Sequence, residues 1–116
     1  GAYDEPVSVA YRDRAEVEAS FARCLGVLMR GDGLPMVATH DPRLIELARG
    51  LGRDRPYELQ MLHGVRPAAQ RALAAEGETV RVYVPYGTEW FGYFMRRLAE
   101  RPANLAFFLR SLLSRG

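Results

Sequence analysis

Three short segments rich in apolar and β-branched residues limit the folds open to this chain. They are LPMVATH (residues 34–40), YELQML (57–62) and TVRVYVP (79–85). Each is followed by a loop and then by a helical pattern of apolar residues, and this alternation is typical of βα units that share a parallel sheet. We therefore expect an α/β fold with parallel strands.

The other segments carry helix signals. Residues 13–30 predict a helix with one buried stripe, because apolar residues recur there at three- and four-residue steps. The members of this stripe are Val17, Phe21, Cys24 and Leu28. Pro42 and Pro67 predict the first turns of two helices of about ten residues, since proline is well tolerated at that position. Further helices are expected over residues 88–101 and within RPANLAFFLRSLL (101–113).

This order of elements predicts half of a (βα)8 TIM barrel, about four βα units plus a terminal helix, in which the first unit contributes only the end of its strand at residues 1–3. A small doubly wound sheet is the alternative. With 116 residues, the chain is long enough for one domain but not for two, and we expect a single partial domain over residues 1–116. Both architectures place functional residues at the carboxyl ends of the strands, here 1–3, 39–41, 62–64 and 83–87.

The composition excludes several classes of function. All 16 basic residues counted as lysine plus arginine are arginine, but a net charge of +2 is too weak to indicate nucleic-acid binding without a clustered patch. Neither a glycine-rich nucleotide motif nor G-x-S-x-G occurs, so a Rossmann site and covalent hydrolase chemistry are not supported. No apolar run approaches the roughly 18 residues of a membrane-spanning helix.

Cys24 is the single cysteine of the chain, so a disulfide within the chain is impossible. It lies among apolar residues of the segment 13–30, and we expect a small buried hydrophobe rather than a nucleophile. This use of cysteine fits a reducing cytoplasm.

The predicted helix 88–101 has a polar and an apolar side. The polar side consists of Tyr93, Arg96, Arg97 and Glu100. The simplest interpretation is a solvent-exposed face with an i,i+4 pair between Arg96 and Glu100, worth about 0.2–0.5 kcal/mol. If the helix lies over the strand ends instead, the two guanidiniums offer bidentate donors to one carboxylate or phosphate. Periodicity leaves both interpretations open.

Two histidines, His40 and His63, follow successive predicted strands, so they are expected on the same edge of the sheet. With Asp41 they could form a metal site, but their spacing matches no compact metal motif. Hydrogen bonding to a cofactor, or a purely structural place in a loop, is the better expectation, and we expect no metal.

Several segments, taken in order, resemble the C-terminal half of the bacterial, monofunctional proline dehydrogenase family. They are GAYDEP, ATHDPRLI, YELQMLHGVR, VRVYVPYGTEWFGYFMRRLAERPANL and FFLRSLL, and together they cover nearly the whole chain. The resemblance implies a distorted (βα)8 barrel that binds FAD at the carboxyl ends of its strands. It also implies oxidation of L-proline to 1-pyrroline-5-carboxylate, with quinone as electron acceptor and a cytoplasmic protein that is peripheral to the inner membrane.

The resemblance also implies roles for single residues. Arg96 and Arg97 match the paired arginines that bind the proline carboxylate, and Glu100 matches the acidic residue that holds this pair. Tyr83 matches a tyrosine that contacts the substrate, and Leu62 matches a leucine that lines the proline ring. On the FAD side, the matching residues are Gly1, Ala2, Thr39 and His40. These roles need no protein nucleophile, because flavin performs the oxidation.

The chain departs from the family pattern in its extent. It starts after the lysine of the family's KGAY stretch and lacks the first βα units, which carry further substrate-binding residues. We therefore expect the isolated chain to bind FAD weakly or not at all and to lack turnover. Two alternatives are a non-catalytic half-barrel that self-associates or pairs with a missing N-terminal half, and a barrel enzyme that binds phosphate through Arg96 and Arg97. The second is disfavoured because no glycine-rich phosphate loop is present.

Overall fold

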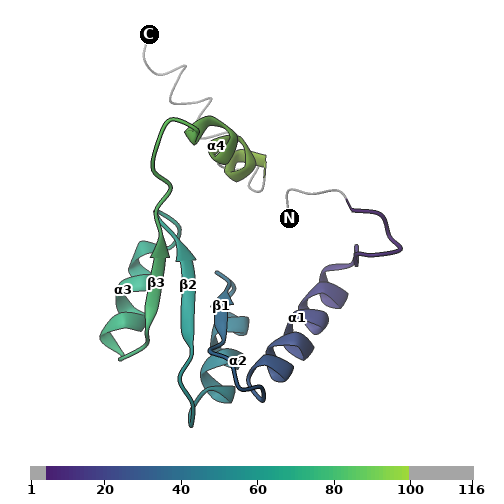
Figure 1. Ribbon diagram of the computed structural model, residues 1–116, viewed down its shortest axis with the longest axis vertical. Coiled ribbons are helices and arrows are strands. Elements are labelled where there is room, and N and C mark those ends of the chain that lie inside the picture. Colours follow the sequence, from purple (N-terminus) through teal and green to yellow (C-terminus); the bar gives the residue numbers. More distant parts are fainter. Residues whose placement is uncertain (1–4, 100–116) are drawn as a thin grey trace. The chain divides into compact units, whose positions relative to one another are not determined.

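The computed structural model describes residues 5–99 (Figure 1). Residues 10–84 form one compact unit, and the helix that follows residue 85 belongs to a second unit. The two units are described separately below. The strand expected at residues 1–3 and the helix expected at 101–113 lie outside the described residues.

The first unit contains a parallel three-stranded sheet in the order β1-β2-β3. Its strands are β1 (Met36–Ala38), β2 (Glu58–Leu62) and β3 (Val80–Tyr83). Each strand lies inside one of the three segments that the sequence marks, so the prediction of an α/β fold with parallel strands is confirmed. The strands are shorter than those segments, because regular backbone pairing does not extend to the segment ends.

Three helices connect and flank these strands: α1 (Arg14–Leu28), α2 (Pro42–Leu51) and α3 (Pro67–Ala75). The predicted helix starts at Pro42 and Pro67 are confirmed, and each proline occupies the first turn. Asp13 caps α1, where its carboxylate accepts from the amides of Ala15 and Glu16 at 2.8 and 3.2 Å. Asp41 caps α2 in the same way, accepting from the Arg43 amide at 2.8 Å.

The hydrophobic core lies on one face of the sheet. All three helices and all three strands contribute to a single cluster of apolar side chains. Its buried members are Leu25, Met29, Val37, Ile45, Ala48, Leu59, Met61 and Leu73, with Phe21, Tyr57 and Val80 packed against it. The opposite face of the sheet is far more open, with Met36 60% and Tyr83 57% exposed. One-sided coverage of a parallel sheet therefore defines this unit.

The buried stripe expected on α1 is wrong except at Phe21, which packs against the core. The buried residues are Leu25 and Met29, whereas Cys24 and Leu28 are exposed and Val17 is 48% exposed. The helix has two neighbouring apolar stripes, and it packs against α2 and the core through the second of them. Periodicity shows that a helix is amphipathic, but it cannot choose between two adjacent stripes.

Polar contacts near the amino ends of β2 and β3 connect α2 to the segment between α3 and β3. The guanidinium of Arg49 contacts the carboxylates of Glu46, Glu76 and Glu78, each at 2.9 Å. The hydroxyl of Tyr57 donates to Glu78 at 2.5 Å, and its partial burial raises the pKa of this phenol. The Tyr57 ring is thus held between the core and this network, directly over Gly52.

Gly52 and Gly50 form a matched pair for a stability test. A Cβ at Gly52 would overlap the Tyr57 ring, whereas a Cβ at Gly50 would meet nothing within 4 Å. We expect Gly52→Ala to lower the free energy of unfolding by about 1–3 kcal/mol, a typical cost of overpacking. Gly50→Ala lies inside α2 and should be neutral or stabilising by up to about 1 kcal/mol. Urea denaturation measures both, and equal stability of the two variants would contradict this packing.

Candidate functional site

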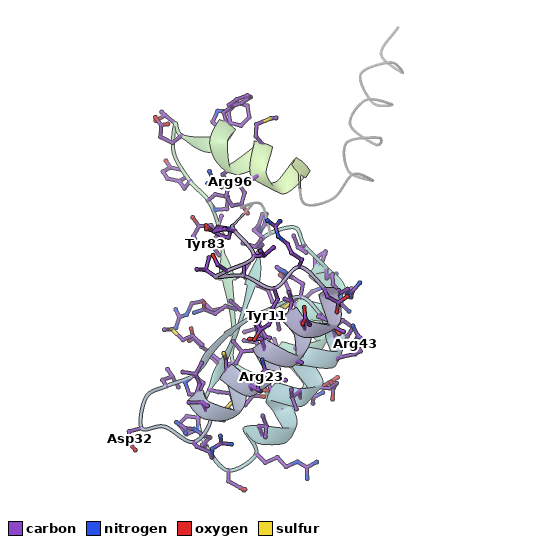
Figure 2. The ribbon with its side chains drawn as sticks, turned by 90° about the vertical axis from the view of Figure 1, so that its right-hand side faces the viewer. Tyr11, Arg23, Asp32, Arg43, Tyr83 and Arg96 are labelled. Carbon is purple, nitrogen blue, oxygen red and sulfur yellow. The ribbon has the colours of Figure 1, made fainter. Side chains whose placement is uncertain are left out.

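The carboxyl ends of β2 and β3 bring two predicted substrate residues together. Leu62 and Tyr83 are register partners in the parallel ladder, so their side chains leave the sheet on the same side. Leu59 and Met61 of β2 are buried in the core. Because side chains alternate along a strand, Leu62 and Tyr83 lie on the open face. Figure 2 labels Tyr83, which is the last residue of β3.

The predicted flavin residues Thr39 and His40 lie at the same edge, directly after β1. The His40 Nε2 accepts a hydrogen bond from the Leu62 amide at 2.9 Å, which joins the end of β1 to the end of β2. The Thr39 hydroxyl accepts from the Asp41 amide at 3.2 Å. The structure therefore places Thr39, His40, Leu62 and Tyr83 along one rim of the sheet.

Two residues that sequence reasoning missed support this rim. The Arg66 guanidinium donates to the His40 carbonyl at 2.5 Å, and Gln70 Nε2 donates to the carbonyls of Leu62 and Val65 at 2.9 and 2.8 Å. Arg66 has a φ of 53°, a conformation that costs energy for a residue with a side chain. The sequence does not signal this conformation, because a residue before proline is biased toward extended backbone rather than toward positive φ.

The two histidines have different environments. His40 is half-buried, and its Nε2 lone pair is engaged by the Leu62 amide, so this nitrogen cannot also bind a metal. His63 is exposed, and its backbone amide donates to the Tyr83 carbonyl at 2.9 Å. Among the residues that the structure describes, no group of three His, Cys, Asp or Glu side chains is placed to hold a metal ion.

The open face also carries a polar layer, which lies on the amino-terminal side of Leu62 and Tyr83 and consists of Glu58, Gln60 and Arg81. The carboxylate of Glu58 accepts two hydrogen bonds from the Arg81 guanidinium and one from Gln60 Nε2, all at 2.7 Å. Glu58 is only 3% exposed, although it carries a charge. These donors, Arg81 first, lower its pKa from 4.5 to about 2. Both oxygens of the Glu58 carboxylate are thus paired under the rim, and sequence reasoning did not single this pair out.

The second unit contains α4 (Trp90–Ala99), which begins two residues later than expected. Arg96 is exposed, and its guanidinium passes beside Gly92, where a Cβ would lie 3.6 Å from one of its nitrogens. Trp90, Phe91 and Met95 are also exposed, at 60%, 62% and 46%.

The remaining predicted site residues lie beyond the described side chains. Gly1, Ala2 and Glu100 are outside the described residues, and of Arg97 only the helical backbone is described. The carboxylate-binding role of Arg96 and Arg97 therefore stays a prediction. None of the helices in the described part of the chain is long and apolar enough to cross a lipid bilayer.

Comparison with known proteins gives one consistent result. A family model for proline dehydrogenase matches residues 3–110. Proline dehydrogenase of Deinococcus radiodurans is 46% identical over 119 residues, which cover 97% of this chain and 38% of that protein. Proline dehydrogenase 1 of Bacillus subtilis is 43% identical over 120 residues, covering 99% of this chain and 40% of that protein. The chain thus spans about two fifths of the length of these relatives.

The Glu58–Arg81 pair predicts a specific dependence of stability on pH. Because the folded chain lowers the pKa of Glu58 from 4.5 to about 2, the unfolded chain binds more protons between these values. The stabilisation is therefore complete above about pH 4.5 and is lost as the pH falls toward about 2. We expect Glu58→Gln to flatten this part of the curve of unfolding free energy against pH, measured by urea denaturation.

Arg81→Met serves as the partner control, because it removes the main group that lowers the pKa of Glu58. It should flatten the same part of the curve, and the double variant should add little to either single variant. If Glu58→Gln keeps the wild-type dependence of unfolding free energy on pH, another group causes the loss of stability in acid.

Proposed function

Because the chain belongs to the proline dehydrogenase family, we propose that it carries the substrate-carboxylate side of an FAD-dependent enzyme that oxidises L-proline to 1-pyrroline-5-carboxylate. The observation that carries this proposal is the family match over residues 3–110, and the rim formed by Thr39, His40, Leu62 and Tyr83 at the carboxyl ends of the strands supports it. The chain spans about two fifths of its relatives, so the complete reaction belongs to the whole protein.

The proposed architecture is the C-terminal half of a (βα)8 barrel. A doubly wound sheet carries helices on both faces, whereas a barrel carries them only on its outer face. In residues 10–84 all three helices share one core on one face of the sheet. This one-sided coverage supports the barrel, with the open face of β2 and β3 directed toward its interior.

We assign the substrate carboxylate to the paired arginines of α4. Arg96 and Arg97 offer permanently charged, planar donors that suit bidentate binding of a carboxylate, and Glu100 would orient them. Leu62 offers an aliphatic wall to the proline ring, and Tyr83 offers a ring with a polar tip. In this assignment the protein positions proline and excludes water, which is catalysis by orientation rather than by a nucleophile.

The residues after β1 suit contacts to a flavin cofactor. The Thr39 hydroxyl accepts from Asp41, which leaves its proton to donate to an acceptor such as a phosphate or a ring carbonyl. The His40 ring is fixed by the Leu62 amide, so any contact that it makes is preoriented. A bound FAD supplies the two-electron oxidation. Electrons would then pass to quinone, which implies a cytoplasmic protein that meets the inner membrane from its surface.

Reconstitution tests whether the chain contributes to a flavoenzyme. The isolated chain should neither retain FAD on gel filtration nor bleach flavin absorbance with L-proline. A chimera in which this chain replaces the matching segment of the Deinococcus radiodurans relative should do both. A chimera that folds and retains FAD but leaves proline unoxidised would contradict the proposed function. Oxidation of L-proline by the isolated chain would contradict the proposal that part of the site lies in the rest of the protein.

The arginine assignment predicts a selective loss in the same chimera. Arg96→Met and Arg97→Met should each weaken proline binding about 30-fold or more, because removing one partner of a hydrogen-bonded charge pair costs at least about 2 kcal/mol. FAD content should be unchanged. Arg71→Met is the matched control, since Arg71 is exposed on α3. Unchanged apparent KM values for proline in both α4 variants would refute a carboxylate role for these arginines.

A further inference from the structure

The open face of β2 and β3 carries a charge pair that the proposed function does not use. Glu58 of β2 and Arg81 of β3 share this face with Leu62 and Tyr83, because side chains alternate along a strand. Arg81 precedes Tyr83 by two residues, which is about 7 Å along a strand. The pair therefore lies next to the rim at which the proposed site holds its ligands.

This pair is a fixed dipole and not a carrier of protons. The Glu58 carboxylate accepts from Arg81 and Gln60 at 2.7 Å, and these donors, Arg81 first, lower its pKa to about 2. It is therefore ionised at neutral pH and unsuited to act as a general base. The same contact raises the pKa of the Arg81 guanidinium, which always carries its positive charge.

The two ends of the dipole differ in exposure. The side chain of Glu58 is 3% exposed, whereas that of Arg81 is 67% exposed. Arg81 donates to Glu58 only through Nε and Nη2, so three of its five N–H groups are not used by this pair. Within residues 5–99, no hydrogen bond from its Nη1 is formed. The negative end is thus buried, and the positive end is presented on the open face.

Stability alone does not explain a charge pair at this position. The interior of a (βα)8 barrel is usually filled by bulky branched apolar side chains. Apolar residues of similar volume often replace a buried ion pair with no loss of stability. If the rest of the protein encloses the open face, the remaining N–H groups of Arg81 need acceptors. A ligand that gains negative charge during the reaction would provide them.

We propose that Arg81, oriented by Glu58, directs a fixed positive charge at the isoalloxazine ring of FAD and stabilises the negative charge that this ring gains on reduction. A hydride from C5 of proline carries two electrons and one proton, so the proline ring becomes the protonated imine and the flavin ring gains one negative charge. Charge near a flavin tunes its electronics. Arg96 and Arg97 are already assigned to the proline carboxylate, which leaves the flavin ring for Arg81. The inference rests on the proposed function for its cofactor.

Sulfite tests this charge without proline and without turnover. Sulfite adds to N5 of oxidised flavin and leaves negative charge on the ring, and this addition bleaches the visible absorbance of the flavin. The Kd for sulfite is measured by titration of the FAD-loaded chimera with the Deinococcus radiodurans relative. Only molecules that hold FAD contribute to the signal, so a loss of stability does not change the measured Kd.

The two partners of the pair should shift this Kd in opposite directions. Arg81→Met should raise it about tenfold or more, because a unit charge about 10 Å away has an effect of this size at an effective dielectric constant of about 20. Glu58→Gln should lower it, since Arg81 then keeps its charge without a neutralising partner. A merely structural role would shift both variants in the same direction.

Three further variants complete the test. Arg81→Lys keeps the positive charge and should stay within about threefold of the unmodified chimera. Arg71→Met removes an exposed arginine of α3 and should leave the Kd unchanged. Arg81→Met leaves a buried carboxylate without its main partner, so the double variant Glu58→Gln/Arg81→Met provides a second measurement. The double variant should bind sulfite more weakly than Glu58→Gln alone.

Four results would overturn the inference. The first is a shift of the Kd in the same direction, or no shift, in both Arg81→Met and Glu58→Gln. The second is an Arg81→Lys variant that binds sulfite as weakly as Arg81→Met. The third is an Arg81→Met variant that weakens the binding of proline but not of sulfite, which would assign Arg81 to the substrate. The fourth is a folded chimera that retains no FAD. If the sulfite results are as expected but proline is not oxidised, only the proposed function fails.

Discussion

The alternation of side chains along β2 is the constraint on which the rest of the structure depends. Leu59 and Met61 point into the core and fix the strand against the helices. The residues between and after them, Gln60 and Leu62, must then leave the sheet on the opposite side. A shift of one residue would exchange the two sets, burying an amide in the apolar core and removing Leu62 from the rim. The packing energy of one face of β2 thus positions the candidate site on the other.

The end of β2 also links the neighbouring elements. The Leu62 amide donates to His40, and its carbonyl accepts from Gln70, so both backbone groups of this residue are bound by side chains. The next residue, His63, donates its amide to the Tyr83 carbonyl. Leu62 was predicted only to line a substrate, but its backbone also connects the loops that follow β1 and β2. Replacement of the Leu62 side chain would leave these backbone bonds in place, so its effect on a ligand can be separated from its effect on the fold.

The sequence predicted the elements of this fold better than the faces they present. Strand segments and first-turn prolines have local causes, so the three parallel strands and the starts of α2 and α3 were found. The choice between two apolar stripes on α1 depends on where α2 lies, and this tertiary information has no local signal. The same holds for Glu58 and Arg81, whose pairing requires the register of two strands 23 residues apart. At the site, strand order predicted a common rim for Thr39, His40, Leu62 and Tyr83, whereas the residues that hold this rim, Arg66 and Gln70, reach it from a loop and a helix.

The open surfaces of the first unit explain how one small sheet can serve both assembly and function. Three helices cover most of its core face, where Val82 of β3 remains 37% exposed. The outer edge of β1 and the open face of β2 and β3 are different surfaces. The edge faces no other strand among the described residues, whereas the open face presents the Glu58–Arg81 pair and a rim of side chains. If the sheet continues at the β1 edge, its curvature would enclose the open face, lower its dielectric constant and strengthen every charge interaction there. Enclosure of the open face would then strengthen the binding of a charged ligand at the rim.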